Sequence, residues 1–280
     1  MRLPIAIASL VSVSVALPVF ADEPLAPPAT TPVTTTPLST TPVTAVPAFA
    51  LMDVNGERSR LDTELALGIP IGGGDGVLYN MRLRGELMSR SGFGGYGSFV
   101  AGGFSDGPGL AAGNLELGGL YHATLSQSID LGFHVGLILP TAGDEALGPA
   151  IATEIGRPSD LVMIARSEWI RIGVSPQVRD GAMFARADLG LDHALGSMAD
   201  DDDTLLHLNA GVGVGGAHWS VAGELQVLFA PGGGESLTTT GISVHYNDGH
   251  ISPFVALSTP LGNELSGEAI TLAAGVGMIL

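Results

Sequence analysis

The chain has 280 residues, with 41 Gly and no Cys, and its 28 acidic residues outnumber 11 basic residues to give a net charge of -17. A nucleic-acid partner would require a basic surface. The strongly acidic charge, with Arg as the only basic residue type, argues against such a partner. The lack of Cys excludes disulfides, thiolate chemistry and a lipidated cysteine at the mature N-terminus.

Residues 1–21 have the pattern of a secretory signal peptide. Arg2 supplies the basic start, residues 3–18 form an apolar stretch, and the tripeptide ending at Ala21 fits a signal peptidase site. We expect cleavage after Ala21 and export from the cytoplasm. A retained membrane anchor is the alternative, but the apolar stretch is short and contains two prolines, which makes it a poor spanning helix.

Residues 22–57 are predicted to form a disordered linker in the periplasm. Pro, Thr, Ala and Val dominate this region up to about residue 48, as in PPATTPVTTTPLSTTPVTAVP. Such a composition cannot bury enough apolar surface to offset the entropy of ordering, and its prolines favour extended conformations. A tether or spacer is the simplest interpretation, and glycosylation or attachment to the cell wall is the alternative.

Residues 58–280 repeat a two-residue alternation of apolar and polar side chains, with no helical period. In VLYNMRLRGELM, residues 77–88, Met81 and Leu83 share one side and Arg82 and Arg84 the other. A β-strand sends successive side chains to opposite faces, so each segment has one apolar and one polar face. About twelve such strands are predicted, beginning near residues 60, 77, 93, 114, 130, 167, 182, 205, 219, 237, 250 and 269.

The connections between these strands alternate in length. Residues 140–160 and 196–203 are long loops, whereas 89–92 and 126–128 are tight turns. An even strand number with short turns at one end and long loops at the other is typical of bacterial outer-membrane barrels rather than of a secreted sandwich. The predicted fold class is therefore all-β, a transmembrane antiparallel up-and-down β-barrel of about 12 strands. The sixth strand is the least defined, because residues 161–165 are apolar on both sides.

Aromatic residues on the apolar side indicate where the barrel would meet the membrane surfaces. Trp219 and Phe229 lie on one strand, ten residues apart. On a tilted strand this is roughly 25 Å of height, the separation of two aromatic girdles. Tyr246 and Phe133 are predicted to lie near the level of Trp219. Leu280 ends the last apolar face, where the barrel-assembly machinery usually meets an aromatic residue.

The polar side of the strands defines a predicted lumen with charges of both signs. Cross-lumen pairing and a selectivity lining are both compatible with this pattern, and the densest cluster is Arg82, Arg84 and Glu86. Inward glycines such as Gly118 and Gly190 leave volume that side chains would otherwise fill, which favours a water-filled channel. The predicted lining consists of Asp62, Glu64, Arg82, Arg84, Glu86, Glu116, Arg171, Arg186, Asp188 and Glu224.

Motifs for chemistry are weak in this sequence. Residues 211–216 match the pattern GxGxxG, but a strand pattern follows, so the helix N-terminus that would hold a pyrophosphate is missing. The acidic residues 200–203 suit a solvated loop better than a cation site. His122 and His134 lack a third metal ligand, and Asp192 and His193 are strand neighbours that point apart. We predict no cofactor, no metal and no catalytic residues.

The segment GLILPTAGDE, residues 136–145, carries a family resemblance. With the signal peptide and the Gly-rich amphipathic strands, it resembles the outer-membrane barrels of the phenol-degradation meta-pathway transporters. In those barrels a strand ends in a similar Leu-Pro-Thr-Gly before a long outer loop, and Ala142 stands here where Gly is usual. The resemblance implies passive uptake of small, often hydrophobic or aromatic, molecules and names no catalytic residues.

These patterns predict a monomeric barrel in the outer membrane of a Gram-negative bacterium, in contact with the lipid bilayer, lipopolysaccharide and the barrel-assembly machinery. The expected function is a channel or passive transporter for small solutes, and not an enzyme. The alternative is a non-conducting structural or surface-binding barrel, whose extracellular loops engage a partner. Whether a loop folds inward as a plug stays open at this point.

Overall fold

A computed structural model describes most of the chain after the predicted linker. The described residues lie within one compact unit, residues 41–280. They are residues 49–52, 54–71, 76–105, 110–143, 156–165, 167–195, 204–231, 236–261 and 269–280. The predicted signal peptide and most of the predicted linker lie outside them. None of the helices in these ranges is long and apolar enough to cross a membrane.

Twelve antiparallel strands and one short 3-10 helix make up the described structure. The strands are β1 (Arg60–Pro70), β2 (Leu78–Met88), β3 (Phe93–Phe104), β4 (Ala111–Thr124), β5 (Ile129–Leu139), β6 (Glu168–Asp180), β7 (Met183–Leu195), β8 (Thr204–Gly215), β9 (Trp219–Phe229), β10 (Leu237–Tyr246), β11 (Ile251–Leu261) and β12 (Ala269–Ile279), and the helix is η1 (Pro158–Ile164). Each predicted strand start lies within three residues of the observed one. The uncertain sixth strand begins at Glu168.

Each strand pairs with its sequence neighbours, and β1 pairs with β12 to close the barrel. The closing register runs from Arg60 opposite Ile279 to Pro70 opposite Ala269, with no shift along the strand. Closure leaves no sheet edge with unpaired backbone groups, which a strand structure in lipid requires. The predicted fold class is confirmed.

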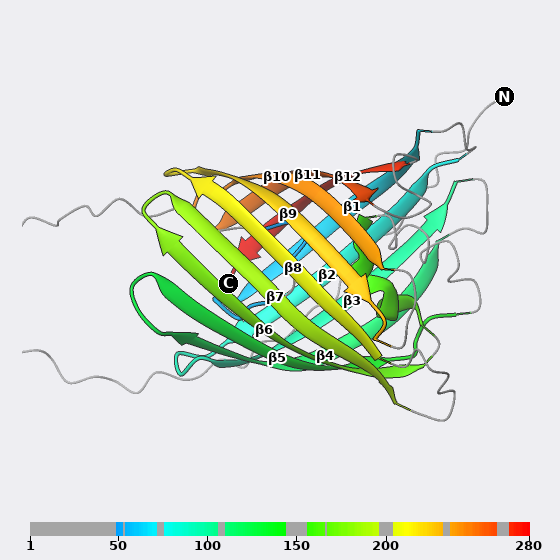
Figure 1. Ribbon diagram of the computed structural model, residues 1–280, viewed down its shortest axis with the longest axis horizontal. Helices are drawn as coiled ribbons and strands as arrows, with labels where there is room; N and C mark the ends of the chain where they lie inside the picture. The colour runs from blue at the N-terminus through cyan, green and yellow to red at the C-terminus, as the bar shows by residue number, and fades with distance from the viewer. Residues whose placement is uncertain are drawn as a thin grey trace, which may run out of the picture. The chain divides into compact units, whose positions relative to one another are not determined.

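Short turns and long connections lie at opposite ends of the barrel (Figure 1). The turns after β2, β6 and β10 contain Gly92, Gly181 and Gly249, which have φ of 83°, 58° and 99°. Glycine adopts these positive φ angles without the steric penalty that other residues meet. The chain therefore reverses tightly after each even-numbered strand, whereas η1 belongs to the long connection at the other end.

The outer surface of the barrel is apolar and the inner surface is polar. On β9 the outward Val221 and Leu225 are exposed, whereas the inward Glu224 and Gln226 are buried. The same alternation places exposed Leu, Val, Ile and Met side chains on all sides of the barrel. Water-soluble proteins rarely expose apolar surface of this extent, so the outer face suits lipid.

The lumen holds two stretches of chain that are not part of the wall. One is the inner segment, residues 49–52 and 54–58, in which Phe49, Met52 and Val54 are buried. The other is η1, whose Val162 and Met163 are buried against β3 and β5 at the long-loop end. Of the predicted linker, residues 22–57, the structure describes residues 49–52 and 54–57, and these lie in the lumen. The Pro- and Thr-rich composition of the whole region hid this feature. The stretch FALMDVNGE nevertheless carries the apolar side chains that a buried segment needs.

The lumen is also less open than the inward glycines predicted. A Cβ added at Gly118 or Gly136 would meet the Tyr96 ring, and one at Gly190 would meet the His207 ring. At Gly132 an added Cβ would lie 2.7 Å from the Asn55 carbonyl oxygen of the inner segment. The glycines therefore make room for neighbouring side chains and for the inner segment. These glycines therefore do not leave the open volume that the sequence pattern indicated.

Candidate functional site

All ten side chains of the predicted lining lie on inward positions of their strands. Eight are buried, whereas Asp62 and Glu64 keep 16% and 12% of their side-chain surface exposed. They come from six strands: Asp62 and Glu64 from β1, Arg82, Arg84 and Glu86 from β2, Glu116 from β4, Arg171 from β6, Arg186 and Asp188 from β7, and Glu224 from β9. The residues form separate groups rather than one continuous ladder.

The first group joins β1 and β2 near the short-turn end. Arg60 places its Nε 3.0 Å from both the Asp62 and the Glu86 carboxylates. Arg84 Nε lies 3.4 Å from Asp62 Oδ2. The register sets Asp62 opposite Arg84 and Arg60 opposite Glu86, so the ion pairs follow directly from strand pairing. Arg60 was absent from the predicted lining, although its parity with Asp62 could have revealed it.

The second group crosses β4, β6 and β7. Arg171 Nε lies 2.8 Å from Asp192 Oδ1, and its Nη1 lies 3.3 Å from Glu116 Oε2. Tyr96 donates a 2.6 Å hydrogen bond to the other Glu116 oxygen. Nearby on β7, Arg186 pairs with Asp188 at 2.7 Å. Removing one partner of a buried pair of this kind destabilises a protein strongly, because the other charge then stays buried without a counter-charge.

The third group ties η1 to the wall, and the sequence offered no warning of it. Arg157 Nη2 lies 2.7 Å from Glu64 Oε2, and Asp160 pairs with Arg82. Asn114 on β4 donates hydrogen bonds to the Val162 and Ala165 carbonyl oxygens, at 3.0 and 2.7 Å. Arg157 and Asp160 lie in a connection without strand period, so no pattern marked them as lumen residues.

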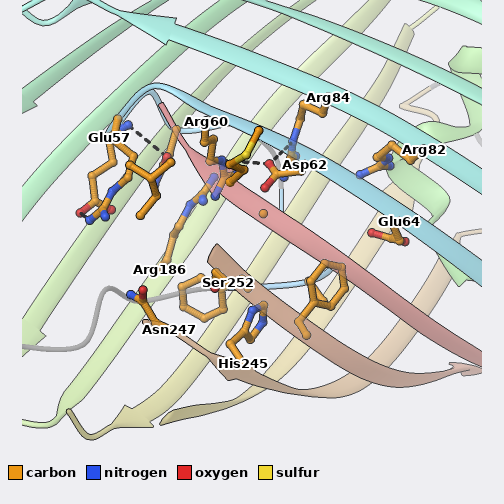
Figure 2. Close-up of a pocket in the computed structure, with 18 residues that line it drawn as sticks. Glu57, Arg60, Asp62, Glu64, Arg82, Arg84, Arg186, His245, Asn247 and Ser252 are labelled. Carbon is orange, nitrogen blue, oxygen red and sulfur yellow. Dashed lines mark hydrogen bonds and ion pairs between the residues drawn. The ribbon is translucent and has the colours of Figure 1, made fainter. Parts of the chain in front are cut away.

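A cavity of about 900 Å³, including the part open to solvent, lies at the short-turn end of the lumen. Its wall includes Asn247 of the turn after β10 and Ile279 near the end of β12. Figure 2 shows Arg60, Asp62 and Arg84 side by side at this cavity, with Arg186, His245 and Ser252 around the same hollow. The His245 ring stacks on Phe254 with centroids 5.1 Å apart. We call this cavity the vestibule.

The inner segment bounds the vestibule on the lumen side. Phe49, Ala50 and Asn55 belong to the vestibule wall. Beyond them, Arg157 donates a hydrogen bond to the Ala50 carbonyl oxygen, which joins η1 to the inner segment. The two inserts thus contact each other within the lumen.

Three of the predicted girdle residues lie at the short-turn end of the barrel, and the fourth lies at the long-loop end. Trp219 and Tyr246 are register partners, and their rings lie 4.9 Å apart. Phe133 stacks on Tyr121 with centroids 6.3 Å apart, four residues after β5 begins. Phe229 ends β9 at the long-loop end. Their role at the two membrane surfaces stays a prediction.

The remaining sequence motifs have ordinary structural roles. Residues 211–216 belong mainly to β8, and β9 begins three residues later, so no helix follows the glycines. Asp192 is buried in the lumen, whereas His193 is exposed beside Thr204. Within the described ranges no group of three or more His, Asp or Glu side chains could hold a metal ion. The acidic residues 200–203 lie outside the described residues.

Closed strand order, apolar exterior and charged interior define the fold class of bacterial outer-membrane β-barrels. Among solved structures, the KdgM porin in complex with disordered oligogalacturonate matches with a TM-score of 0.54 and 10% identity, over 79% of this chain and 99% of that chain. The NanC porin matches with a TM-score of 0.53 and 10% identity, over 79% and 100%. At this identity the likeness shows the fold alone.

Sequence comparisons do not assign the chain to a family. No protein-family model matches the chain, and no curated protein matches it. The resemblance to the phenol-degradation transporters therefore stays a prediction from the sequence pattern.

Proposed function

We propose that this chain is an outer-membrane channel or passive transporter for small solutes whose lumen is closed at rest. The observation that carries the proposal is the way in which the stretches of chain inside the lumen are held to the barrel wall. Two inserts, the inner segment and η1, lie in the lumen, and hydrogen bonds and ion pairs hold them to the wall. Such contacts can break without unfolding the barrel, because the strand ladder does not depend on them.

The polar vestibule supports passage of small solutes. Arginine and carboxylate side chains face it together, so it offers hydrogen bonds to polar groups of either charge. The fold likeness to two porins agrees with this class, and one of those porins is described in complex with oligogalacturonate. The low identity gives no basis for assigning that ligand to this chain.

A non-conducting structural barrel is the second candidate, and one observation favours it. η1 is held by two ion pairs, by the Asn114 hydrogen bonds, and by an apolar cluster with Val100, Ile138 and Trp169. Contacts this numerous are also what a permanent filling of the lumen would show. The expected absence of enzyme activity and the expected contacts with lipopolysaccharide and the assembly machinery stay predictions.

Conductance in planar bilayers separates the two candidates. We expect the purified protein to give small, intermittent currents, because the inserts leave the closed position only occasionally. The double variant Arg157→Ala, Asp160→Ala removes both ion pairs of η1 and should conduct more and for longer. His193→Ala, on the exposed side of β7, is the matched control and should behave like the unaltered protein. Absence of current in both forms, with folding intact by heat-modifiable gel mobility, would support the structural barrel.

A further inference from the structure

The inner segment is bound to the barrel wall through its main chain. Glu224 accepts two hydrogen bonds from backbone N–H groups, from Ala50 to Oε1 at 3.0 Å and from Leu51 to Oε2 at 2.7 Å. Ser243 donates a third hydrogen bond to Oε1 at 2.6 Å. The buried carboxylate is therefore satisfied largely by the peptide backbone it holds.

Other wall side chains continue this pattern along the segment. Gln226 donates to the Leu51 carbonyl oxygen, Arg84 Nη1 to that of Met52 at 3.3 Å, and Arg186 Nη2 to that of Val54 at 3.4 Å. Glu86 Oε2 accepts from the Gly56 N–H at 3.0 Å. Carboxylates thus meet N–H groups, and amide or guanidinium groups meet carbonyl oxygens. This is the complementarity that a peptide main chain requires.

Glycines in the wall let the segment approach closely. A Cβ added at Gly211 would lie 2.6 Å from a Phe49 ring carbon and 2.7 Å from the Met52 methyl carbon. A Cβ added at Gly241 would lie 2.8 Å from the Leu51 side chain. Each approach is closer than a Cβ tolerates. The wall therefore has a groove for a peptide with apolar side chains, lined by small residues and by main-chain-directed polar groups.

We propose that this part of the lumen wall, built from β2, β7, β8, β9 and β10, is a binding site for a peptide segment and that the inner segment is its resident occupant. Main-chain hydrogen bonds are common to every peptide, so the site accepts other peptide segments with apolar side chains where the groove receives Phe49, Leu51 and Met52. Such a segment enters from the vestibule, which opens at the short-turn end. The ligand class is thus a peptide, which goes beyond passage of small solutes.

Leu51→Pro in the full-length protein tests this inference, because proline removes the N–H that Glu224 accepts and leaves the wall unchanged. The probe is a fluorescent peptide with the sequence of residues 49–58, and its binding is followed by anisotropy in detergent. We expect binding to the variant to be about tenfold tighter than to the unaltered protein, since the resident segment loses a charge-assisted hydrogen bond. Adding Glu224→Ala to the variant should abolish this gain.

A control peptide with Pro at the position of Leu51 should not compete, whereas one with Ser at the position of Ala50 should compete normally. Competition by the Pro peptide, or failure of the Ser peptide to compete, would show that the site does not recognise the main chain. Absence of saturable binding to the Leu51→Pro variant would overturn the proposal. None of these readouts uses conductance, so they are independent of the proposed function.

A second measurement avoids any effect of Leu51→Pro on folding. The protein has no native Cys, so Ala50→Cys introduces a single thiol in a buried position beside Ala256 and Ala273. Excess unlabelled peptide should raise the rate of maleimide labelling of this thiol, because the resident segment is displaced. The peptide with Pro at the position of Leu51 should leave the rate unchanged. An unchanged rate with both peptides would mean that the segment is a fixed part of the lumen, and the proposal would fail.

Discussion

Leu83 lies between two lumen arginines on β2, but its own side chain faces outward and is 45% exposed. We expect Leu83→Arg to place a charge against lipid and to destabilise the barrel by about 2 to 4 kcal/mol if this position is near the midplane. Unfolding by urea in lipid vesicles, followed by heat-modifiable gel mobility, measures the loss. The matched control is Leu83→Met, which keeps an apolar side chain at the same outward position. Equal stability of Leu83→Arg and the unaltered protein would show that this face does not meet lipid.

Arg82 and Arg84 each hold one of the inserts. Arg82 pairs with Asp160 of η1, and Arg84 binds both Asp62 and the Met52 carbonyl oxygen of the inner segment. The double variant Arg82→Ala, Arg84→Ala should keep the barrel wall folded but loosen both inserts. We expect larger conductance and a reversal potential shifted toward cations in a salt gradient, because acidic lumen groups lose their counter-charges.

Two outcomes would separate these roles of Arg82 and Arg84. Larger conductance without a change in reversal potential would make the arginines structural ties only, and the selectivity hypothesis would fail. A folded variant with unchanged conductance and unchanged reversal potential would contradict both roles.

At the scale of elements, one buried amide contributes two of the contacts that hold η1 in the lumen. Asn114 donates to two carbonyl oxygens at the end of η1, and its Oδ1 accepts from the Ala142 N–H at 2.9 Å. Asn114→Ala would leave these backbone groups without that partner, which typically costs about 1 to 3 kcal/mol for each buried group. We expect η1 to detach more often while the barrel stays folded.

Limited proteolysis with trypsin measures this detachment. The chain has no Lys, so trypsin can cut only after Arg. Pro158 follows Arg157 and blocks cleavage there, so the site that reports on η1 is Arg166, two residues after the helix ends. Cleavage after Arg166 should accelerate in Asn114→Ala. Thr141→Ala is the control, because it removes a single hydrogen bond to the Gly113 carbonyl oxygen near the same place. Equal cleavage rates for both variants and the unaltered protein would show that Asn114 does not hold η1.

At the scale of the whole molecule, the two barrel ends predict the orientation in the membrane. The turn after β10 is short and contains Asp248. The pKa of Asp248 lies below its usual value, because the backbone N–H groups of Ile251 and His250 donate hydrogen bonds to its carboxylate. The connection between β7 and β8 is longer, and its acidic residues lie outside the described residues. Short turns of outer-membrane barrels face the periplasm.

Epitope tags test this orientation on intact cells. A tag inserted near Asp201 should be labelled by antibody, whereas one near Asp248 should be labelled only after the outer membrane is permeabilised. The reverse pattern would mean that the orientation is inverted. Labelling at neither site in permeabilised and intact cells would contradict insertion of a folded barrel.

The sequence by itself determined the strand number, the strand starts and the side of each strand that faces inward. These features are local, because the pleat of a strand converts a two-residue period into two faces wherever it occurs. The alternation in VLYNMRLRGELM was therefore enough to place Arg82 and Arg84 inside and Leu83 outside.

Only the tertiary structure decided what fills the lumen. Glu224 and Leu51 are 173 residues apart, and Arg157 and Glu64 are 93 apart, so their contacts leave no periodic trace in the sequence. The inward glycines looked like open volume for the same reason, since the side chains and backbone that use this space come from distant parts of the chain. Barrel closure brings these residues together, because it joins strands from the two ends of the domain around a single narrow interior.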